Sequence, residues 1–235
     1  MNRLSLLPFL RTAYNRFVSH ARFAATYRSF RAFTMIPRRM FIDNLRVVSM
    51  ASHVSGCVVE CGVWRGGMSA GIASVLGPHR TYYLFDSFEG LPPAQPIDGA
   101  SAIAWQHATD KPGYFDNCSA GEEHARRAMT AAQAQAVHIV KGWFSDTVPA
   151  FTSDEPIAIL RLDGDWYEST MICLTNLFDK VALGGVIILD DYYSWDGCSK
   201  ATHDFLSQRS AVERIRALGS VCYLIKSSES IDDQN

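Results

Sequence analysis

Two apolar runs of strand length in this sequence each end in a pair of aspartates. One run begins at Ile157 and the other at Gly185. A carboxylate next to a buried strand is costly and clustered carboxylates repel one another, so a bound divalent cation is the natural compensation. The pattern therefore predicts a metal-assisted enzyme. Its four acids are Asp163, Asp165, Asp190 and Asp191.

The spacing within each pair leaves two interpretations open. Asp163 and Asp165 alternate along the chain, so in an extended conformation both would project from the same side of the strand end. Either could instead be a turn residue, or the N-cap of a helix that begins near Ser169. The adjacent Asp190 and Asp191 can both bind one ion only if the chain turns there. Otherwise one of them binds and the other faces solvent.

The composition is that of one ordinary globular domain. The chain has 235 residues, of which 48% are hydrophobic and 20% charged. The net charge of -2 gives no global electrostatic reason to expect a nucleic-acid partner. The six cysteines form no Cys-x-x-Cys pair, which is typical of reduced thiols. With no apolar signal peptide and no apolar run near the roughly 20 residues that span a bilayer, we expect a cytoplasmic protein without a transmembrane segment.

The first 54 residues differ in composition from the rest. Arginines recur from Arg3 to Arg46, and Asp43 is the only carboxylate before Glu60. Organellar transit peptides have this composition, but so do amphipathic helices that pack aromatic residues on the body while arginines face water. We favour the second interpretation and expect a helical cap over residues 1–54 and a second domain over residues 55–235. The residues expected to pack are Phe9, Leu10, Phe17, Phe23, Tyr27, Phe30 and Phe33.

Beyond residue 54, short apolar runs alternate with helix-like stretches. This order favours an α/β fold with a mostly parallel sheet and helices on both of its faces. The tail from Val212 to Ile225 is typical of a hairpin, which would add an antiparallel strand. The segment from Leu91 to Gly113 is predicted to be a long irregular loop. The expected strands are 57–61, 82–85, 137–140, 157–160 and 186–189, and the expected helices are 68–76, 121–136, 170–181 and 198–208.

A glycine-rich turn follows the first strand, at the end of the sheet where ligands bind in such folds. Its spacing, Gly62-x-x-x-Gly66-Gly67, matches neither a Gly-x-Gly-x-x-Gly dinucleotide loop nor a Walker loop. Because Glu60 precedes the turn, we expect a cationic ligand end there, such as the ammonium group of S-adenosylmethionine. Asp86 ends the second strand and is placed to accept ribose hydroxyls. Taken alone, the turn could be an ordinary β-to-α connection and Asp86 a helix N-cap.

Aromatic residues follow the third strand. Trp143 or Phe144 could wall an adenine ring, with Ser145 beside them, although both aromatic side chains could equally belong to the core. Other aromatic residues adjoin the acids, among them Trp166 and Trp195, and could stack on a sugar face or serve as packing. We assign none of these a catalytic role.

Five segments in this order resemble the successive motifs of the macrocin O-methyltransferase (TylF/MycF/NovP-like) family. The resemblance covers about residues 34 to 226. It implies a Rossmann-like class I S-adenosylmethionine methyltransferase with a seven-stranded, mostly parallel sheet, a C-terminal antiparallel hairpin strand and an N-terminal helical lid. It also implies Mg²⁺ or a similar divalent cation, and a sugar hydroxyl of a glycosylated natural product or glycan as acceptor. The segments are ECGVWRGG (60–67), FDSFEGLP (85–92), GWF with TVP downstream (142–149), LDGDWYEST (162–170) and GGVIILDDY (184–192).

The resemblance also implies roles for single residues. Asp165 would be the general base, and the metal ligands would be Asp163, Asp190 and Asp191. The chemistry agrees, because a hard cation with oxygen ligands lowers the pKa of a hydroxyl while a carboxylate takes its proton during methyl transfer. Relatives further suggest a homo-oligomer and a lid that covers the cofactor. The predicted cofactor-binding residues are Thr34, Met35, Glu60, Gly62, Trp64, Gly66, Ser69, Asp86, Ser87, Phe88, Trp143, Ser145 and Asp163.

Two other classes of protein remain open. A catechol-type, metal-dependent O-methyltransferase shares the sheet and a carboxylate-bound cation but acts on phenolic acceptors. A non-catalytic S-adenosylmethionine-binding protein would be expected to have lost at least one of the four acids, and all four are present. The motifs do not identify the acceptor, because lids and irregular loops usually shape an acceptor pocket.

Overall fold

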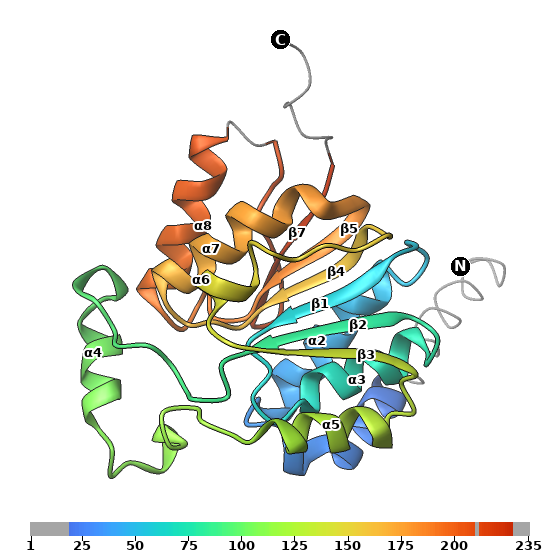
Figure 1. Ribbon diagram of the computed structural model, residues 1–235, viewed down its shortest axis with the longest axis horizontal. Coiled ribbons are helices and arrows are strands. Elements are labelled where there is room, and N and C mark those ends of the chain that lie inside the picture. Colours follow the sequence, from blue (N-terminus) through green and yellow to red (C-terminus); the bar gives the residue numbers. More distant parts are fainter. Residues whose placement is uncertain (1–18, 210–211, 228–235) are drawn as a thin grey trace, which may run out of the picture.

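A seven-stranded sheet runs through the centre of the computed structural model, which describes residues 19–209 and 212–227 (Figure 1). Its strands are β1 (Cys57–Cys61), β2 (Thr81–Asp86), β3 (Ala136–Lys141), β4 (Ile157–Leu162), β5 (Val181–Leu189), β6 (Arg216–Leu218) and β7 (Val221–Ile225). The strand order is β3-β2-β1-β4-β5-β7-β6. Strands β1 to β5 are parallel, and β7 is antiparallel to both β5 and β6. The predicted α/β class, parallel sheet and C-terminal hairpin are confirmed.

Four of the five strands predicted in the parallel part agree with the structure to within two residues at each end. The exception is β5, which was expected over residues 186–189 but begins at Val181. Val181 pairs with Ile157 of β4. Gly184 and Gly185 interrupt the apolar pattern inside β5. Because glycine weakens the apolar pattern of a strand, the sequence of the first half of β5 does not predict a strand.

Helices cover both faces of the sheet, joined by short 3₁₀ turns. Four of them, α3, α5, α7 and α8, correspond to the predicted helices, although α5 ends five residues before the predicted limit, where β3 begins. A further helix spans residues 19–30. The others are α2 (Arg38–Met50), α3 (Gly67–Leu76), α4 (Ala100–His107), α5 (Glu122–Ala131), α6 (Phe144–Thr147), α7 (Tyr167–Leu177) and α8 (Asp196–Gln208), with η1 (Arg31–Phe33), η2 (Pro96–Asp98), η3 (Pro112–Tyr114) and η4 (Phe178–Lys180).

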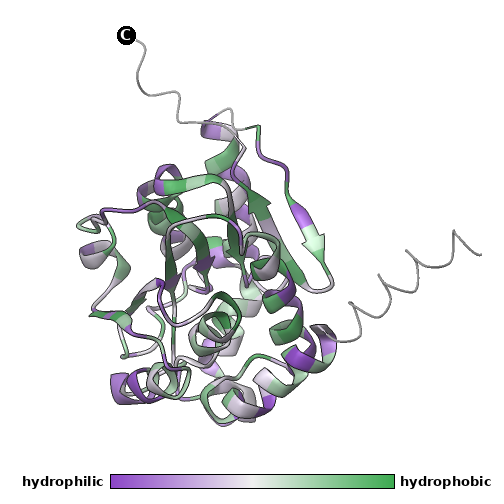
Figure 2. Ribbon diagram, turned by 90° about the vertical axis from the view of Figure 1, so that its right-hand side faces the viewer, coloured by the Kyte–Doolittle hydropathy of each residue, from purple (hydrophilic) through white to green (hydrophobic). Residues whose placement is uncertain are grey.

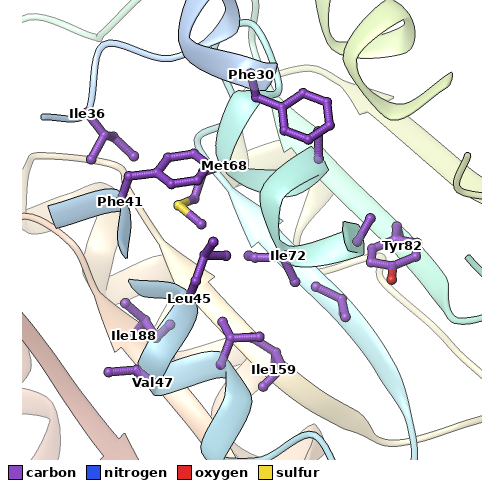
Figure 3. Close-up of a cluster of buried hydrophobic side chains, with 14 of the residues drawn as sticks. Phe30, Ile36, Phe41, Leu45, Val47, Met68, Ile72, Tyr82, Ile159 and Ile188 are labelled. Carbon is purple, nitrogen blue, oxygen red and sulfur yellow. The ribbon is translucent and has the colours of Figure 1, made fainter. Parts of the chain in front are cut away.

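Two hydrophobic clusters, one on each face of the sheet, hold the helices in place. Neighbouring residues of β1 divide between them: Val58 belongs to the cluster under α2, α3 and α5, and Val59 to the cluster under α7 and α8. This alternation is the period of a strand buried on both faces. Figure 3 shows Leu45 of α2 beside Ile72 of α3, and Phe41 of α2 beside Met68 of α3. In Figure 2 the strands at the centre are mostly green and the polar residues lie outside.

The N-terminal helices pack on the body of the molecule, as the amphipathic interpretation predicts. Phe23 and Phe30 are buried, and Tyr27 and Phe33 are partly buried against the same cluster as β1. The predicted packing residues Phe9, Leu10 and Phe17 lie outside the described residues. The division into residues 1–54 and 55–235 stays a prediction. Among the described helices, none is long and apolar enough to cross a membrane.

The segment from Leu91 to Gly113 is not the irregular loop that its composition predicts. It contains η2, the two-turn helix α4 and the start of η3, and α4 lies beside the carboxyl ends of the strands in Figure 1. Asp98 organises it: its Oδ2 accepts a hydrogen bond from the backbone N–H of Gln95 at 2.7 Å, and Gly99, with φ of +89°, turns the chain into α4. Proline and glycine here mark the boundaries of short helices, so the prediction was wrong.

Candidate active site

A cavity of about 410 Å³ opens at the carboxyl ends of β1, β2, β4 and β5. The strand order reverses between β1 and β4, which is where ligands bind in open α/β sheets. The cavity brings together all but three of the residues predicted for the site. Those that line it are Thr34, Met35, Glu60, Gly62, Trp64, Asp86, Ser87, Trp143, Ser145, Asp163, Asp165, Asp190 and Asp191.

The other three predicted residues lie directly behind the cavity wall. Gly66 has φ of +80° and is the N-cap residue of α3, and Ser69 in that helix donates a hydrogen bond to Glu60 Oε2. Phe88 is buried in the cluster under α2 and α3, and its backbone N–H donates to Asp86 Oδ1 at 2.7 Å. These residues support the wall of the cavity.

The acids at the ends of β4 and β5 converge on one point. Asp163, Asp165 and Asp191 each offer a carboxylate oxygen, and these oxygens all lie within 4.8 Å of one another. The two aspartates after β4 do not meet through an extended chain, because Asp165 has φ of +57°. The chain also turns directly after Leu189, the last residue of β5, as two ligands from adjacent positions require.

Neither pair of acids caps the next helix. The N-terminus of α7 is held by Asp98, whose Oδ1 accepts from the backbone N–H of Tyr167 at 2.7 Å. The N-cap residue Trp166 makes no side-chain capping bond. Neither Asp163 nor Asp165 is therefore an N-cap in the structure, and both residues line the cavity instead.

Each of the four acids uses a single oxygen for the hydrogen bonds and ion pairs found among the described residues. Asp165 Oδ1 accepts from the indole Nε1–H of Trp195 at 2.7 Å, and Asp191 Oδ2 accepts from the backbone N–H of Asp165 at 3.0 Å. The oxygens used by Asp163 and Asp190 are Oδ2 and Oδ1. The protein thus orients each carboxylate by one oxygen and leaves the second for a ligand.

Burial and the charges of neighbouring carboxylates raise the pKa values of Asp165, Asp190 and Asp191. Burial, with the charge of Asp163 as the next cause, raises the pKa of Asp165 to about 8. The pKa of Asp191 is raised well above its ordinary value by burial and by Asp165. Burial also raises the pKa of Asp190 to about 6, against the opposing effect of Arg161. A cluster with these properties gains free energy from a bound cation.

Arg161 links the acids, and the sequence motifs do not include it. It is fully buried in β4, and its Nη1 lies 2.5 Å from Glu60 Oε1 and 2.9 Å from Asp163 Oδ2. Its Nη2 lies 2.7 Å from Asp190 Oδ1. The signal was present, because Arg161 is the one charged residue inside the run from Ile157 to Leu162. An arginine in a buried strand needs carboxylate partners.

Asn44 of α2 completes this buried network from the N-terminal region. Its side chain donates to Asp190 Oδ1 at 3.1 Å and accepts from Arg161 Nε at 3.3 Å. This asparagine is wholly buried. A polar residue on the inner face of an amphipathic helix was the available clue.

The turn after β1 builds the side of the cavity that the sequence predicts to hold the cofactor. Gly62 has φ of +89°, and a Cβ there would lie 1.8 Å from the backbone oxygen of Asp163, so only glycine fits. Asp86 Oδ2 accepts from the backbone N–H groups of Val63 and Trp64 at 2.6 and 2.8 Å. Asp86 therefore shapes the turn, in addition to any ligand contact.

Glu60 is enclosed by protein partners. Oε1 contacts Arg161 and Oε2 accepts from Ser69, so both oxygens are in use. Burial raises the pKa of Glu60 to about 7, although Arg161 and Ser69 oppose that shift. An ammonium ligand would be a third partner for this carboxylate.

The remaining walls are aromatic and apolar. Trp143 precedes α6 and is 38% exposed, and Phe144 and Ser145 line the cavity beside it. Thr34 and Met35 lie in the segment between η1 and α2 and form part of the same lining. Around Asp165, the rings of Trp105, Trp166 and Trp195 pack edge to face, with centroids 5.3 to 6.2 Å apart.

A mostly parallel sheet with an antiparallel C-terminal strand pair, a glycine turn after β1 and ligand-binding side chains at the carboxyl edge define a Rossmann-like fold of the methyltransferase class. The chain belongs to the macrocin O-methyltransferase family: the family model described as Macrocin-O-methyltransferase (TylF) matches residues 7–226. The predicted family is confirmed.

Three characterised proteins are similar in sequence. Demethyldecarbamoylnovobiocin O-methyltransferase of Streptomyces niveus is 35% identical over 66% of this chain and 60% of its own length. The 8-demethyl-8-(2,3-dimethoxy-alpha-L-rhamnosyl)-tetracenomycin-C 4'-O-methyltransferase of Streptomyces olivaceus is 36% identical over 70% of this chain and 64% of its own length. Mycinamicin III 3''-O-methyltransferase of Micromonospora griseorubida is 31% identical, over 78% and 74% respectively. The chain thus spans less than two thirds of the first two relatives.

Solved structures agree on the fold. The O-methyltransferase NovP superposes with a TM-score of 0.69 at 30% identity, covering 83% of each chain. The calicheamicin methyltransferase CalS11 superposes with a TM-score of 0.60 at 20% identity, covering 86% of this chain and 91% of its own. At this lower identity the second likeness supports the fold alone.

Proposed function

We propose that this chain is an S-adenosylmethionine-dependent O-methyltransferase that methylates a sugar hydroxyl of a glycosylated small molecule or glycan, assisted by a divalent cation. The observation that carries the proposal is one cavity with a glycine turn, Glu60 and Asp86 on one side and four aspartates on the other. Family membership supports the methyl transfer. The names of the relatives support a glycosylated acceptor, since one of them contains a rhamnosyl group.

The acidic cluster fits a divalent cation of the Mg²⁺ type. Its donors are all carboxylate oxygens, which hard cations prefer, and those of Asp163, Asp165 and Asp191 lie within 4.8 Å of one another. Asp190 adjoins the group, and only its Oδ1 is used by Arg161 and Asn44, so Oδ2 is available as a ligand. When bound, the cation would lower the pKa of an acceptor hydroxyl and help to orient it. The proposed ligands are Asp163, Asp190 and Asp191.

Asp165 is the proposed general base. The indole of Trp195 fixes its Oδ1, so Oδ2 is the oxygen that would take the proton of the acceptor hydroxyl. Burial raises the pKa of Asp165 to about 8, and a bound cation nearby would lower it and so keep the carboxylate ionised, as a general base must be. Methyl transfer also requires the acceptor oxygen, the methyl carbon and the sulfur in line, so part of the acceleration is positioning.

The cofactor would lie along the carboxyl ends of β1, β2 and β3. Glu60 and the turn at Gly62 would hold its amino-acid end, and Asp86 its ribose hydroxyls. Trp143 is exposed enough to stack on an adenine ring, because 38% of its surface is accessible. Thr34 and Met35 would cover the cofactor from the N-terminal side, where they line the cavity.

A panel of acceptors tests the substrate class. The protein, with labelled S-adenosylmethionine and Mg²⁺, is offered rhamnosides of aromatic aglycones, the free aglycones and simple catechols. Label in the rhamnosides alone is expected. Turnover of catechols alone would replace the proposal with a phenol methyltransferase. Binding of S-adenosylhomocysteine without turnover of any acceptor in a broad glycoside set would favour a non-catalytic cofactor-binding protein. We also propose that the protein is located in the cytoplasm and forms a homo-oligomer.

A further inference from the structure

We propose that Arg161 is a positioning residue that fixes the cofactor-side acid Glu60 relative to the metal-side acids Asp163 and Asp190. The inference rests on the proposed function of the same cavity and adds a residue to which neither the family motifs nor the chemistry of the acids assigns a role. Arg161 is fully buried and would act through the three carboxylates.

The geometry of the guanidinium suits this task. Its Nη1 reaches both Glu60 and Asp163, at 2.5 and 2.9 Å, and its Nη2 reaches Asp190 at 2.7 Å. Glu60 lies on β1 directly opposite Arg161 in the register of β1 and β4, whereas Asp190 follows β5 on the other side of β4. A single rigid fork therefore joins acids from three neighbouring strands.

The charge of this group favours a functional role over a structural one. One guanidinium faces three carboxylates, so the unit keeps two negative charges when all of its members are ionised. For stability alone, buried ion pairs are commonly no better than apolar residues of similar volume. An ammonium group beside Glu60 and a divalent cation beside Asp163 and Asp190 would neutralise this remaining negative charge.

Asn44 extends the unit to the N-terminal region. Its carbonyl oxygen accepts from Arg161 Nε at 3.3 Å and its amide donates to Asp190 Oδ1 at 3.1 Å. The same amide donates to the backbone oxygen of Met40, which lines the cavity. Helix α2, which follows Thr34 and Met35, is thereby tied to the fork.

The test compares Arg161→Lys with Arg80→Lys. Lysine keeps the positive charge of Arg161 but has no planar fork to hold three carboxylates. Arg80 is the matched control, because it also makes two hydrogen bonds of 2.9 Å, to the backbone oxygens of Gly56 and Ser52, outside the cavity. The measurements are S-adenosylhomocysteine affinity by calorimetry and Mn²⁺ affinity by electron paramagnetic resonance, each without the other ligand, so that no turnover is needed.

We expect Arg161→Lys to weaken both affinities by about tenfold or more, as the loss of charge-assisted hydrogen bonds would predict. Arg80→Lys should leave both within about twofold of wild type. If Arg161→Lys does not fold, Asn44→Ala decides, since it removes the contacts to Arg161 and Asp190 and keeps every charge; about threefold weakening of both ligands is then expected.

Unchanged affinities in Arg161→Lys, or in Asn44→Ala where the first variant is unfolded, would overturn the positioning role. Equal losses in Arg161→Lys and Arg80→Lys would also overturn it, because a general loss of stability would then explain the effect. If the wild-type protein binds neither S-adenosylhomocysteine nor Mn²⁺, the proposed function itself fails. If wild type binds both and only the variants behave as just described, the positioning role alone fails.

Discussion

At the scale of single residues, each of the four aspartates after β4 and β5 is held by one carboxylate oxygen. Asp165 is the clearest case: its backbone lies in the left-handed region, which aspartate tolerates better than most residues, and Trp195 holds its Oδ1. This backbone conformation brings Asp165 next to Asp163 and Asp191. Under the proposed function, Asp165 Oδ2 is the oxygen that would take the proton.

Asp165→Asn removes the base and keeps the shape of the side chain. We expect the turnover number to fall by about 10²- to 10⁴-fold, the usual contribution of a general base, while affinity for S-adenosylhomocysteine stays within about twofold. Initial rates and calorimetry measure the two effects. The exposed Asp110, changed to Asn, is the control. A cofactor affinity that fell as much as the turnover would refute the assignment of Asp165.

Trp195→Phe removes the hydrogen bond to Asp165 and keeps the ring packing. We expect a turnover number lower by about tenfold, since a hydrogen bond to a charged acceptor is lost. Trp105→Phe is the matched control: Trp105 belongs to the same aromatic group, but its Nε1–H donates to the backbone oxygen of Gly113 at 3.1 Å. Similar losses in both variants would mean that the aromatic group acts only by packing.

The four acids could be predicted from the sequence because they follow apolar strands directly. Arg161 and Asn44 could not, because their importance lies in the partners that they meet. Arg161 contacts Glu60 only through the register of β1 and β4, and Asn44 contacts Asp190 across 146 positions of the chain. A local sequence pattern does not reveal such long-range contacts. A lone arginine in an apolar strand indicates only that it has a carboxylate partner somewhere in the fold.

At the scale of elements, the junction of β1 and β4 places a titratable acid inside the sheet. The pKa of Glu60 is raised from 4.5 to about 7, chiefly by burial. Between these pH values the folded chain binds more protons than the unfolded chain, so the free energy of unfolding decreases as pH rises.

The pH dependence of unfolding tests this shift. With chelator present, the free energy of unfolding of wild type should fall more steeply between pH 5 and 7 than that of Glu60→Gln, with a difference in slope of up to about 1 kcal/mol per pH unit. Denaturant titrations at several pH values measure both slopes. Equal slopes would show that Glu60 keeps an ordinary pKa in the folded chain.

The connection between η2 and α7 rests on Asp98, which accepts backbone hydrogen bonds from Gln95 and Tyr167 and is 2% exposed. Asp98→Ala leaves two N–H donors without this acceptor, so we expect a loss of about 1 to 3 kcal/mol in the free energy of unfolding. The exposed Asp154→Ala should change it by less than about 0.5 kcal/mol. An Asp98→Ala variant as stable as that control would show that this link contributes nothing.

Most elements followed from alternating strand and helix patterns, and the exceptions have physical causes. The proline and glycine residues around α4 predict a loop, but in the structure they mark the ends of short helices. The start of β5 was missed because Gly184 and Gly185 erase the apolar pattern there, while the pairing of Val181 with Ile157 holds that half of the strand. Tertiary contacts decide both cases.

At the scale of the whole molecule, the two halves of the sheet supply the two halves of the proposed chemistry. Strands β1, β2 and β3 end at the glycine turn, Asp86 and Trp143, and strands β4 and β5 end at the acids. Helix α2 lies on the N-terminal side of the cavity, and its Asn44 contacts Arg161 and Asp190 of the second half. Arg161 joins that half to Glu60 of the first. The order of the strands in the sheet is what makes these segments neighbours.

The central claim is metal-assisted methyl transfer to a sugar hydroxyl, and the metal requirement tests it most directly. The rate of methyl transfer to a rhamnoside acceptor is measured on chelator-treated protein, before and after Mg²⁺ is restored, with the affinity for S-adenosylhomocysteine followed in parallel. We expect activity to be lost with the metal and to return with Mg²⁺ in wild type, whereas Mg²⁺ should not restore it in Asp191→Asn. Full activity of the chelator-treated protein would contradict the central claim.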